Sequence, residues 1–395
     1  MLPYIDCEVY VQQPEGFEVH GDSNEKLVLK LNKSLYGLKQ SGRNWNNLLH
    51  KYLSDQGFKQ SQVDPCVYTM QSNNDLTVIL CYVDDILLMS SSDKVLSETK
   101  GKQKKKFVMK DLGQISHFLG IEFSHENGTI AMHQTDYLNR LLCRFDMLNC
   151  KPKYTPCDMN VNKFENEPAE ETDATLYREI VGGLIYAMTC TRPDLSFVVT
   201  KLSQHMSKPN ARHMTMAKHT LRYIKATINK QLVFRKSENP LTLTGFCDSD
   251  WANSEDRKSV SGYCFQMASE GPLISWKSKK QNCIALSTCE AEYVSLSLAT
   301  QEGIFLMALI NDMFCLNVIK FHIECDNQSA ISLAKNPVLS QRTKHIDIKY
   351  HFLRNLVHND TMKINYVPSE CNVADALTKP MTKVKNERFK CIAMG

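Results

Sequence analysis

The stretch TLTGFCDSDW, residues 242–251, decides the fold because it is typical of a strand that ends in an acid. From the preceding Leu241 onward, Leu241, Leu243 and Gly245 alternate with Thr242, Thr244 and Phe246, which is the period of a strand with one buried face. Asp248 stands near the end of this run, and a carboxylate at a strand end extends beyond the edge of its sheet. The stretch therefore predicts a strand that carries Asp248 to an exposed edge.

The residues that follow extend this strand into a mixed sheet. Two more strand-like runs, 260–267 and 272–279, precede a helix that begins near Ser287, and strands at 320–326 and 362–367 alternate with later helices. Three strands before the first long helix, followed by alternation, indicate antiparallel pairing first and parallel pairing afterwards. We expect an α+β domain with helices on the faces of one mixed sheet.

Four acids stand at the ends of these elements. Ser287 and Glu290 form the capping box S-T-C-E, which predicts a helix whose first turns include Glu292. Asp326 ends the strand at 320–326, and Asp375 opens the last helix. Each acid alone has an ordinary explanation as a turn residue, a cap or an acid favoured at a helix N-terminus.

Taken together, the four acids in this order resemble the catalytic set of ribonuclease H. Over about 241–381, the local sequence is similar to the copia branch of retrotransposons. The segments that carry this likeness are FCDSDW (246–251), RKSVSGY (257–263), STCEAEY (287–293), ECDNQ (324–328), TKHIDIKYHF (343–352) and ADALTKP (374–380). The resemblance implies two Mg²⁺ ions on Asp248, Glu292, Asp326 and Asp375, acting on RNA paired to DNA. Lys344 and Lys349 are expected to contact the hybrid, or else form a solvated basic surface.

The segment YVDD, residues 82–85, is a second candidate site. Adjacent acids between two apolar strand-like runs fit the tip of a hairpin, where Asp is tolerated and faces solvent or a metal. Two-metal phosphoryl transfer needs such hard oxygen ligands, and Asp84 and Asp85 would supply part of the set. An ordinary polar turn explains the same pattern.

The context of YVDD resembles copia-type reverse transcriptases. The segments that carry this likeness are LNKSLYGLKQSGRNW (31–45), SQVDPCVY (61–68), LCYVDDILL (80–88) and HFLGIEF (117–123). The resemblance implies that Asp84 and Asp85 lie at the polymerase metal site, that Lys39, Gln40 and Arg43 contact template or nucleotide, and that residues 118–120 form the primer grip. A solvated helix face is the alternative for the basic residues.

The resemblance also predicts that the polymerase site is incomplete. Copia-type enzymes carry a further metal-binding Asp before the segment similar to EVYVQQPEGF, residues 8–17. Asp6 is the only acid near that place, and it lies too close to Val9 to fit the family pattern. We therefore expect weak or absent polymerase activity.

The sequence divides into two chemical regions joined by a helical part. We predict a partial reverse transcriptase palm over 1–159, a linker and helical connection over 160–240 that opens on the polar run 160–175, a ribonuclease H-like domain over 241–382, and a tail over 383–395. Helical spacing of Trp45, Leu48, Leu49 and Leu53 predicts a helix in the palm.

Composition and charge exclude some classes of protein but do not identify the function. Lys and Arg number 47 and Asp and Glu 43, so the net charge of +4 leaves any polyanion to local basic surfaces. The 15 cysteines contain no Cys-x-x-Cys pair, which argues against a disulfide framework or a zinc site and favours a reducing, intracellular location, cytoplasmic or nuclear. No signal peptide or membrane span is expected.

Three functional hypotheses follow. The first is a fragment of a copia-type retrotransposon Pol polyprotein, with a working ribonuclease H and an incomplete RNA-directed DNA polymerase. Its expected partners are RNA–DNA hybrid, template–primer nucleic acid and other segments of Pol. The second is a polymerase that works when further Pol residues are present. The third is a non-catalytic relic or co-opted nucleic-acid-binding protein.

Overall fold

The computed structural model describes residues 5, 7–19, 27–72, 74–161, 170–237, 241–253, 256–268, 271–316, 320–335 and 347–395. The chain forms two compact units. The first comprises Met1–Gln114 with Ala308–Asn317, and the second comprises Ile115–Met307 with Val318–Gly395. The sequence-based domain boundaries at 159, 240 and 382 stay predictions.

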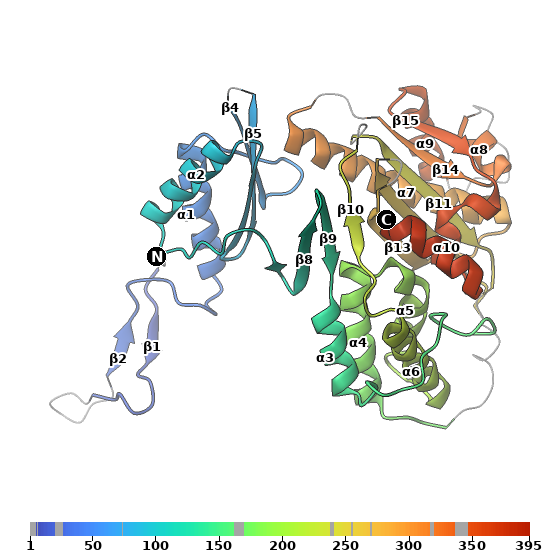
Figure 1. The fold of residues 1–395 in the computed structure, drawn as a ribbon, viewed down its shortest axis with the longest axis horizontal. Helices are drawn as coiled ribbons and strands as arrows, with labels where there is room; N and C mark the ends of the chain where they lie inside the picture. The colour runs from blue at the N-terminus through green and yellow to red at the C-terminus, as the bar shows by residue number, and fades with distance from the viewer. Residues whose placement is uncertain are drawn as a thin grey trace. The chain divides into compact units, whose positions relative to one another are not determined.

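The first unit is a small α+β structure (Figure 1). Its elements are β1 (Tyr10–Gln12), β2 (Val28–Lys30), α1 (Ser41–Asp55), β3 (Lys59–Gln60), β4 (Val67–Ser72), β5 (Asp75–Tyr82), β6 (Asp85–Ser90) and α2 (Asp93–Lys106). β3 to β6 form an antiparallel sheet in chain order, and β1 pairs with β2. The predicted helix is confirmed as α1, which buries Leu49 and Leu53 against Tyr68 and Ile79.

The second unit begins with a hairpin and a helical bundle. These elements are β7 (His117–Phe118), β8 (Ile121–Glu126), β9 (Thr129–His133), α3 (Thr135–Arg144), α4 (Ala174–Cys190), η1 (Pro193–Leu195), α5 (Ser196–Ser203), α6 (Ala211–Ala226) and β10 (Leu232–Phe234). α3 to α6 share one apolar core, which confirms the helices expected between the two chemical regions. Residues 162–169 of the predicted linker lie outside the described residues.

The turn between β7 and β8 requires glycine. Leu119 and Gly120 both have positive φ, at 50° and 75°, as a two-residue hairpin needs. A Cβ atom at Gly120 would lie 2.5 Å from the Tyr186 hydroxyl, which donates a hydrogen bond to the Leu119 carbonyl. This contact holds the hairpin at residues 117–123 against α4.

A five-stranded sheet forms the rest of the second unit. Its elements are β11 (Leu243–Asp250), β12 (Val260–Met267), β13 (Leu273–Lys280), α7 (Thr288–Phe314), β14 (Phe321–Cys325), α8 (Gln328–Lys335), α9 (Asp347–His358), β15 (Met362–Tyr366), η3 (Ser369–Cys371), η4 (Val373–Leu377) and α10 (Lys383–Met394). The strand order is β13-β12-β11-β14-β15. β11, β12 and β13 pair antiparallel, whereas β11, β14 and β15 pair parallel, so the predicted mixed sheet is confirmed.

Helix α7 packs on this sheet. Its Ser295 hydroxyl donates to the carbonyls of Asp248 and Gly262 on β11 and β12, and Gly303 lets α7 approach the Phe321 ring. Among the described residues, α7 is the one helix long and apolar enough to cross a membrane, and 56% of that window is buried within the structure. Length and composition alone therefore do not distinguish it from a core helix.

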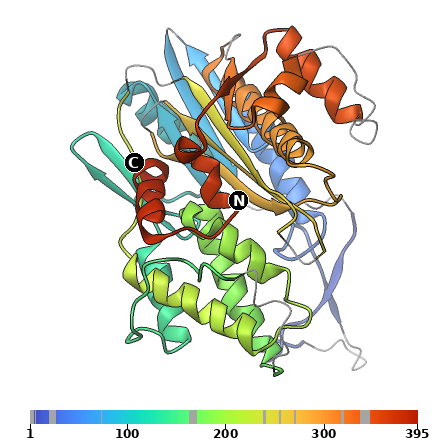
Figure 2. The same cartoon turned by 90° about the vertical axis from the view of Figure 1, so that its right-hand side faces the viewer.

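The residues expected as a tail form α10. Phe389, Ala393 and Met394 are buried, and the helix packs against β10, β13 and η1 (Figure 2). The end of the chain is thus part of the core that joins the helical bundle to the sheet.

Candidate active site

Asp248 lies near the end of β11 and is almost fully buried. Its side chain accepts a hydrogen bond from the Thr378 hydroxyl, and the residue is 4% exposed. Burial raises the pKa of Asp248 to about 6, and the nearby charge of Lys379 opposes that rise. A carboxyl group in this position is costly to ionise unless a cation accompanies it.

Glu292 lies on α7 beside Asp248, and half of its carboxylate lacks a partner. Oε1 accepts a hydrogen bond from the Ser249 backbone N–H at 3.2 Å, while Oε2 is buried with no hydrogen-bond donor. Burial and then the charge of Asp248 raise the pKa of Glu292 to about 10. Such an orphaned acceptor usually marks a function or an ion.

Asp326 and Asp375 complete the group from two further elements. Asp326 directly follows β14, and one of its carboxylate oxygens lies within 4.8 Å of an oxygen of Glu292. Asp375 lies in η4, where it pairs with Lys379 and, at 3.5 Å, with Lys385. Asp375 and Asp326 both act on the pKa of Asp248, so the charges of all four predicted acids interact.

Two features hold η4 against β11. The Asn372 side chain donates to the Cys247 carbonyl at 2.9 Å and accepts from the Ala374 N–H at 3.1 Å. Gly262 on β12 makes room for this segment, because a Cβ atom there would lie 2.9 Å from the Leu377 Cβ. The packing role of Gly262 had no signal in the sequence, whereas Asn372, directly before the helix that carries Asp375, had the signal of an N-cap.

The donor set fits hard divalent cations. Four carboxylates converge from β11, α7, the end of β14 and η4, and Mg²⁺ prefers oxygen ligands of this kind. The orphaned Oε2 of Glu292 and the cationic Lys379 between Asp248 and Asp375 both show where positive charge is stabilised. The predicted ligand roles themselves stay predictions.

Asp250 and Glu290, two acids close in sequence to this set, have other partners. Asp250 is hydrogen-bonded by the Asn253 amide, and burial raises its pKa. The Glu290 carboxylate accepts from the Leu286 N–H at 2.8 Å, and the Ser287 hydroxyl accepts from the Glu290 N–H at 3.2 Å. The expected capping role of Glu290 is confirmed, although its carboxylate accepts from the N–H of Leu286, one residue before the N-cap Ser287.

In the first unit, Asp84 and Asp85 occupy a hairpin tip as predicted. Tyr82 pairs with Asp85 across a two-residue turn, in which Val83 has a φ of 56°. The Trp45 indole N–H donates to the Val83 carbonyl at 2.5 Å and fixes the turn to α1. Both carboxylates are exposed.

The structure describes some of the residues predicted to contact nucleic acid but not others. Lys39, Gln40 and Arg43 line an open depression of about 570 Å³ with Cys7 in the first unit. Lys349 lies on α9, but its side chain is outside the described residues, as are Lys344 and Asp6. The hybrid-binding role of Lys344 and Lys349 stays a prediction.

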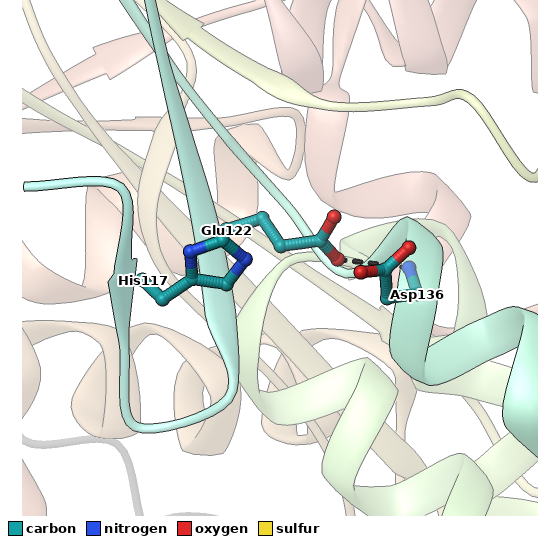
Figure 3. A group of neighbouring side chains, drawn as sticks. All are labelled: His117, Glu122 and Asp136. Carbon is teal, nitrogen blue, oxygen red and sulfur yellow. Dashed lines mark hydrogen bonds between the residues drawn. The ribbon is translucent and has the colours of Figure 1, made fainter.

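One other group of potential metal ligands has a structural explanation. His117, Glu122 and Asp136 lie together near the start of α3 (Figure 3). Glu122 Oε1 accepts from the Asp136 backbone N–H at 2.8 Å, and Oε2 lies 3.5 Å from the His133 ring. Glu122 thus caps a helix N-terminus, which accounts for the cluster.

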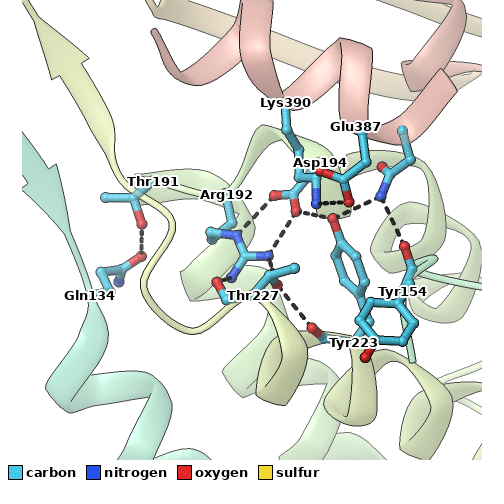
Figure 4. Close-up of polar contacts among 10 residues, drawn as sticks. Gln134, Tyr154, Thr191, Arg192, Asp194, Tyr223, Thr227, Glu387 and Lys390 are labelled. Carbon is cyan, nitrogen blue, oxygen red and sulfur yellow. Dashed lines mark hydrogen bonds and ion pairs between the residues drawn. The ribbon is translucent and has the colours of Figure 1, made fainter. Parts of the chain in front are cut away.

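A buried polar network, which the sequence analysis did not identify, joins the bundle to α10 (Figure 4). Arg192 donates to both oxygens of Asp194 at 2.9 and 2.7 Å, and both side chains are fully buried. The Tyr223 hydroxyl donates to Asp194 at 2.6 Å and accepts from Asn386 of α10 at 3.1 Å. Burial opposes ionisation of Asp194, but Arg192 outweighs it and lowers the pKa of Asp194.

Comparison with known proteins identifies relatives over nearly the whole chain. The family described as reverse transcriptase (RNA-dependent DNA polymerase) matches residues 3–159. The retrovirus-related Pol polyprotein from transposon TNT 1-94 of Nicotiana tabacum is 38% identical over 98% of this chain and 29% of its own length. The chain thus spans under a third of that relative.

A shorter relative matches along almost its entire length. The putative transposon Ty5-1 protein of Saccharomyces cerevisiae is 32% identical over 75% of this chain and 96% of its own length. Among solved structures, RNase H1 from Halobacterium salinarum matches 35% of this chain and 94% of its own, with 14% identity and a TM-score of 0.26. Nothing about activity follows from so low a TM-score.

Proposed function

Because the chain belongs to the copia-type retrotransposon Pol polyproteins, we propose that its five-stranded sheet carries a ribonuclease H that cleaves RNA in RNA–DNA hybrids. Two observations support this proposal: an oxygen of Glu292 lies within 4.8 Å of an oxygen of Asp326, and the charges of Asp326 and Asp375 act on Asp248, which in turn acts on Glu292. These side chains would hold two Mg²⁺ ions. Such ions, when bound, activate water and stabilise the leaving oxygen of a phosphodiester.

The chain's own residues prepare the site for that chemistry. Burial keeps Asp248 and Glu292 away from bulk water, so a cation at these oxygens interacts with them strongly. Thr378 and the Ser249 N–H orient one oxygen of each carboxylate. The positive charge of Lys379 offsets the negative charges of Asp375 and Asp248. Its ammonium group would also donate to a phosphate oxygen of a bound phosphodiester.

The test is cleavage of a hybrid with a labelled RNA strand by the purified full chain in Mg²⁺. Wild type should cleave the RNA strand, and Asp248→Asn should reduce cleavage to background because it removes a buried anionic ligand. Chelation by EDTA should stop wild-type cleavage. A well-folded wild-type chain that leaves the hybrid intact would favour the non-catalytic relic or binding protein.

For the reverse transcriptase region, we propose that Asp84 and Asp85 are metal ligands and that this chain extends primers weakly. Among the described residues, neither group of three or more potential metal ligands includes Asp84 or Asp85. Two adjacent carboxylates on an exposed turn bind two cations poorly.

Primer extension on an RNA template measures this directly. The chain should extend a primer far more slowly than it cleaves a hybrid, and Asp84→Asn should remove any residual extension. Rapid extension by this chain would overturn the proposal and support the polymerase hypothesis.

A further inference from the structure

A buried thiol lies against the proposed ribonuclease carboxylates. Cys325 is the last residue of β14 and is 0% exposed. Its Sγ atom, a Glu292 oxygen and an Asp326 oxygen all lie within 4.8 Å of one another. Hydrolysis of a phosphodiester has no use for a thiol at this place.

The Glu292 carboxylate near this thiol has one oxygen without a partner. Glu292 is 6% exposed, and its Oε2 is buried without a hydrogen-bond donor. A second thiol is close by, because Cys247 on β11 is the register partner of Cys325 on β14. A thiol sulfur therefore lies near a buried carboxyl group that has one unpartnered oxygen.

We propose that Cys325, Glu292 and Asp326 bind a thiophilic divalent cation, Zn²⁺ or Cd²⁺. Thiolate ligands select such cations, whereas oxygen ligands alone suit Mg²⁺. Zn–S and Zn–O bonds of about 2.3 and 2.0–2.2 Å place tetrahedral ligands roughly 3.5 Å apart, so small side-chain shifts suffice. The Cys325 thiol gives its proton to solvent as the metal–sulfur bond forms.

This cation would share two carboxylates, those of Glu292 and Asp326, with the proposed Mg²⁺ site. It would therefore inhibit cleavage, an effect that rests on the proposed function. Zn²⁺ held by a thiolate would exchange slowly and would block the carboxylates that Mg²⁺ needs. Binding itself requires no catalytic activity. The absence of Cys-x-x-Cys pairs hid this site from the sequence analysis, because its ligands come from two separate elements.

Titration of the full chain with Cd²⁺ alone tests binding through the ultraviolet absorption of cadmium–thiolate bonds. Wild type should show one tight equivalent, above weaker binding at exposed cysteines. Cys325→Ser should lose that equivalent. Glu292→Gln, which keeps the thiol, should weaken it roughly tenfold or more, since even outer ligands have effects of that size.

The matched control is Cys264→Ser, at a fully buried thiol on β12 within the same sheet. It should keep the tight equivalent. An unchanged equivalent in Cys325→Ser, or none in wild type, would overturn the inference. Hybrid cleavage in Mg²⁺ is measured separately: cleavage without tight Cd²⁺ binding defeats only this inference, and tight binding without cleavage defeats only the ribonuclease proposal.

Discussion

Glu292 shows how one residue links the sequence to the chemistry of the site. Its position in a capped helix was predictable, because Ser287 and Glu290 fix the helix start at Thr288, four residues earlier. Its burial and its orphaned Oε2 were not predictable, since both depend on α7 packing over β11. The same holds for Lys379 and Cys325, whose roles arise from contacts across separate elements.

Replacing Glu292 by Gln should stabilise the metal-free chain at neutral pH. The variant removes a buried acid whose ionisation is unfavourable, so we expect a gain of about 1–3 kcal/mol at pH 8. Hybrid cleavage should fall to background in the same variant. Thermal unfolding in EDTA, combined with the cleavage assay, measures both effects.

The pH dependence follows from the raised pKa values of Asp248, at about 6, and Glu292, at about 10. Between their ordinary values, 3.8 and 4.5, and these folded values, the folded chain binds more protons than the unfolded chain. The metal-free wild type should therefore lose stability as pH rises from about 5 to 9. Glu292→Gln should show a shallower decline, and parallel slopes would contradict the assignment.

At the scale of elements, the sequence predicted strands and helices better than the segments between them. Alternation and helical spacing identified β11 and α1, each of which repeats a buried face, and the capping box located α7, whose residues 291–297 are all buried. The short η4 has no periodic pattern, and its position depends on Asn372 and on the absence of a side chain at Gly262. The expected tail was a similar case, since α10 is stabilised by contacts with distant elements.

Gly262→Ala should displace η4 and with it Asp375. The added methyl would contact Leu377 and Thr378, and overpacking of this kind costs about 1–3 kcal/mol. Cleavage should fall more than stability alone explains, because Asp375 moves. Half-maximal cleavage should then need a higher Mg²⁺ concentration than in wild type; an unchanged Mg²⁺ dependence would argue against this positioning role.

The network between the bundle and α10 should contribute strongly to stability. Asp194→Ala leaves the fully buried Arg192 without its partner, and such a loss costs about 3–5 kcal/mol. Tyr223→Phe removes only hydroxyl contacts and should cost about 1–3 kcal/mol. Urea unfolding measures both, and equal effects of the two variants would contradict the central place of the Arg192–Asp194 pair.

At the scale of the whole molecule, two groups of motifs share one chain. The resemblance to copia-type Pol polyproteins was visible in ordered motifs, and the relatives confirm the family. Each motif group has its own unit or sheet: Asp84 and Asp85 belong to the first unit, and the four convergent acids belong to the second. What the sequence could not supply was the burial that distinguishes the second group from exposed turn acids.

The most direct measurement compares two substitutions on neighbouring residues at the end of β14. Asp326→Asn removes a predicted metal ligand, whereas Glu324→Gln alters an acid whose carboxylate accepts from Asn365 at 2.9 Å. In Mg²⁺, we expect RNA–DNA hybrid cleavage to vanish in Asp326→Asn and to persist in Glu324→Gln. Equal cleavage by both variants and wild type would contradict a ribonuclease H site at these four carboxylates.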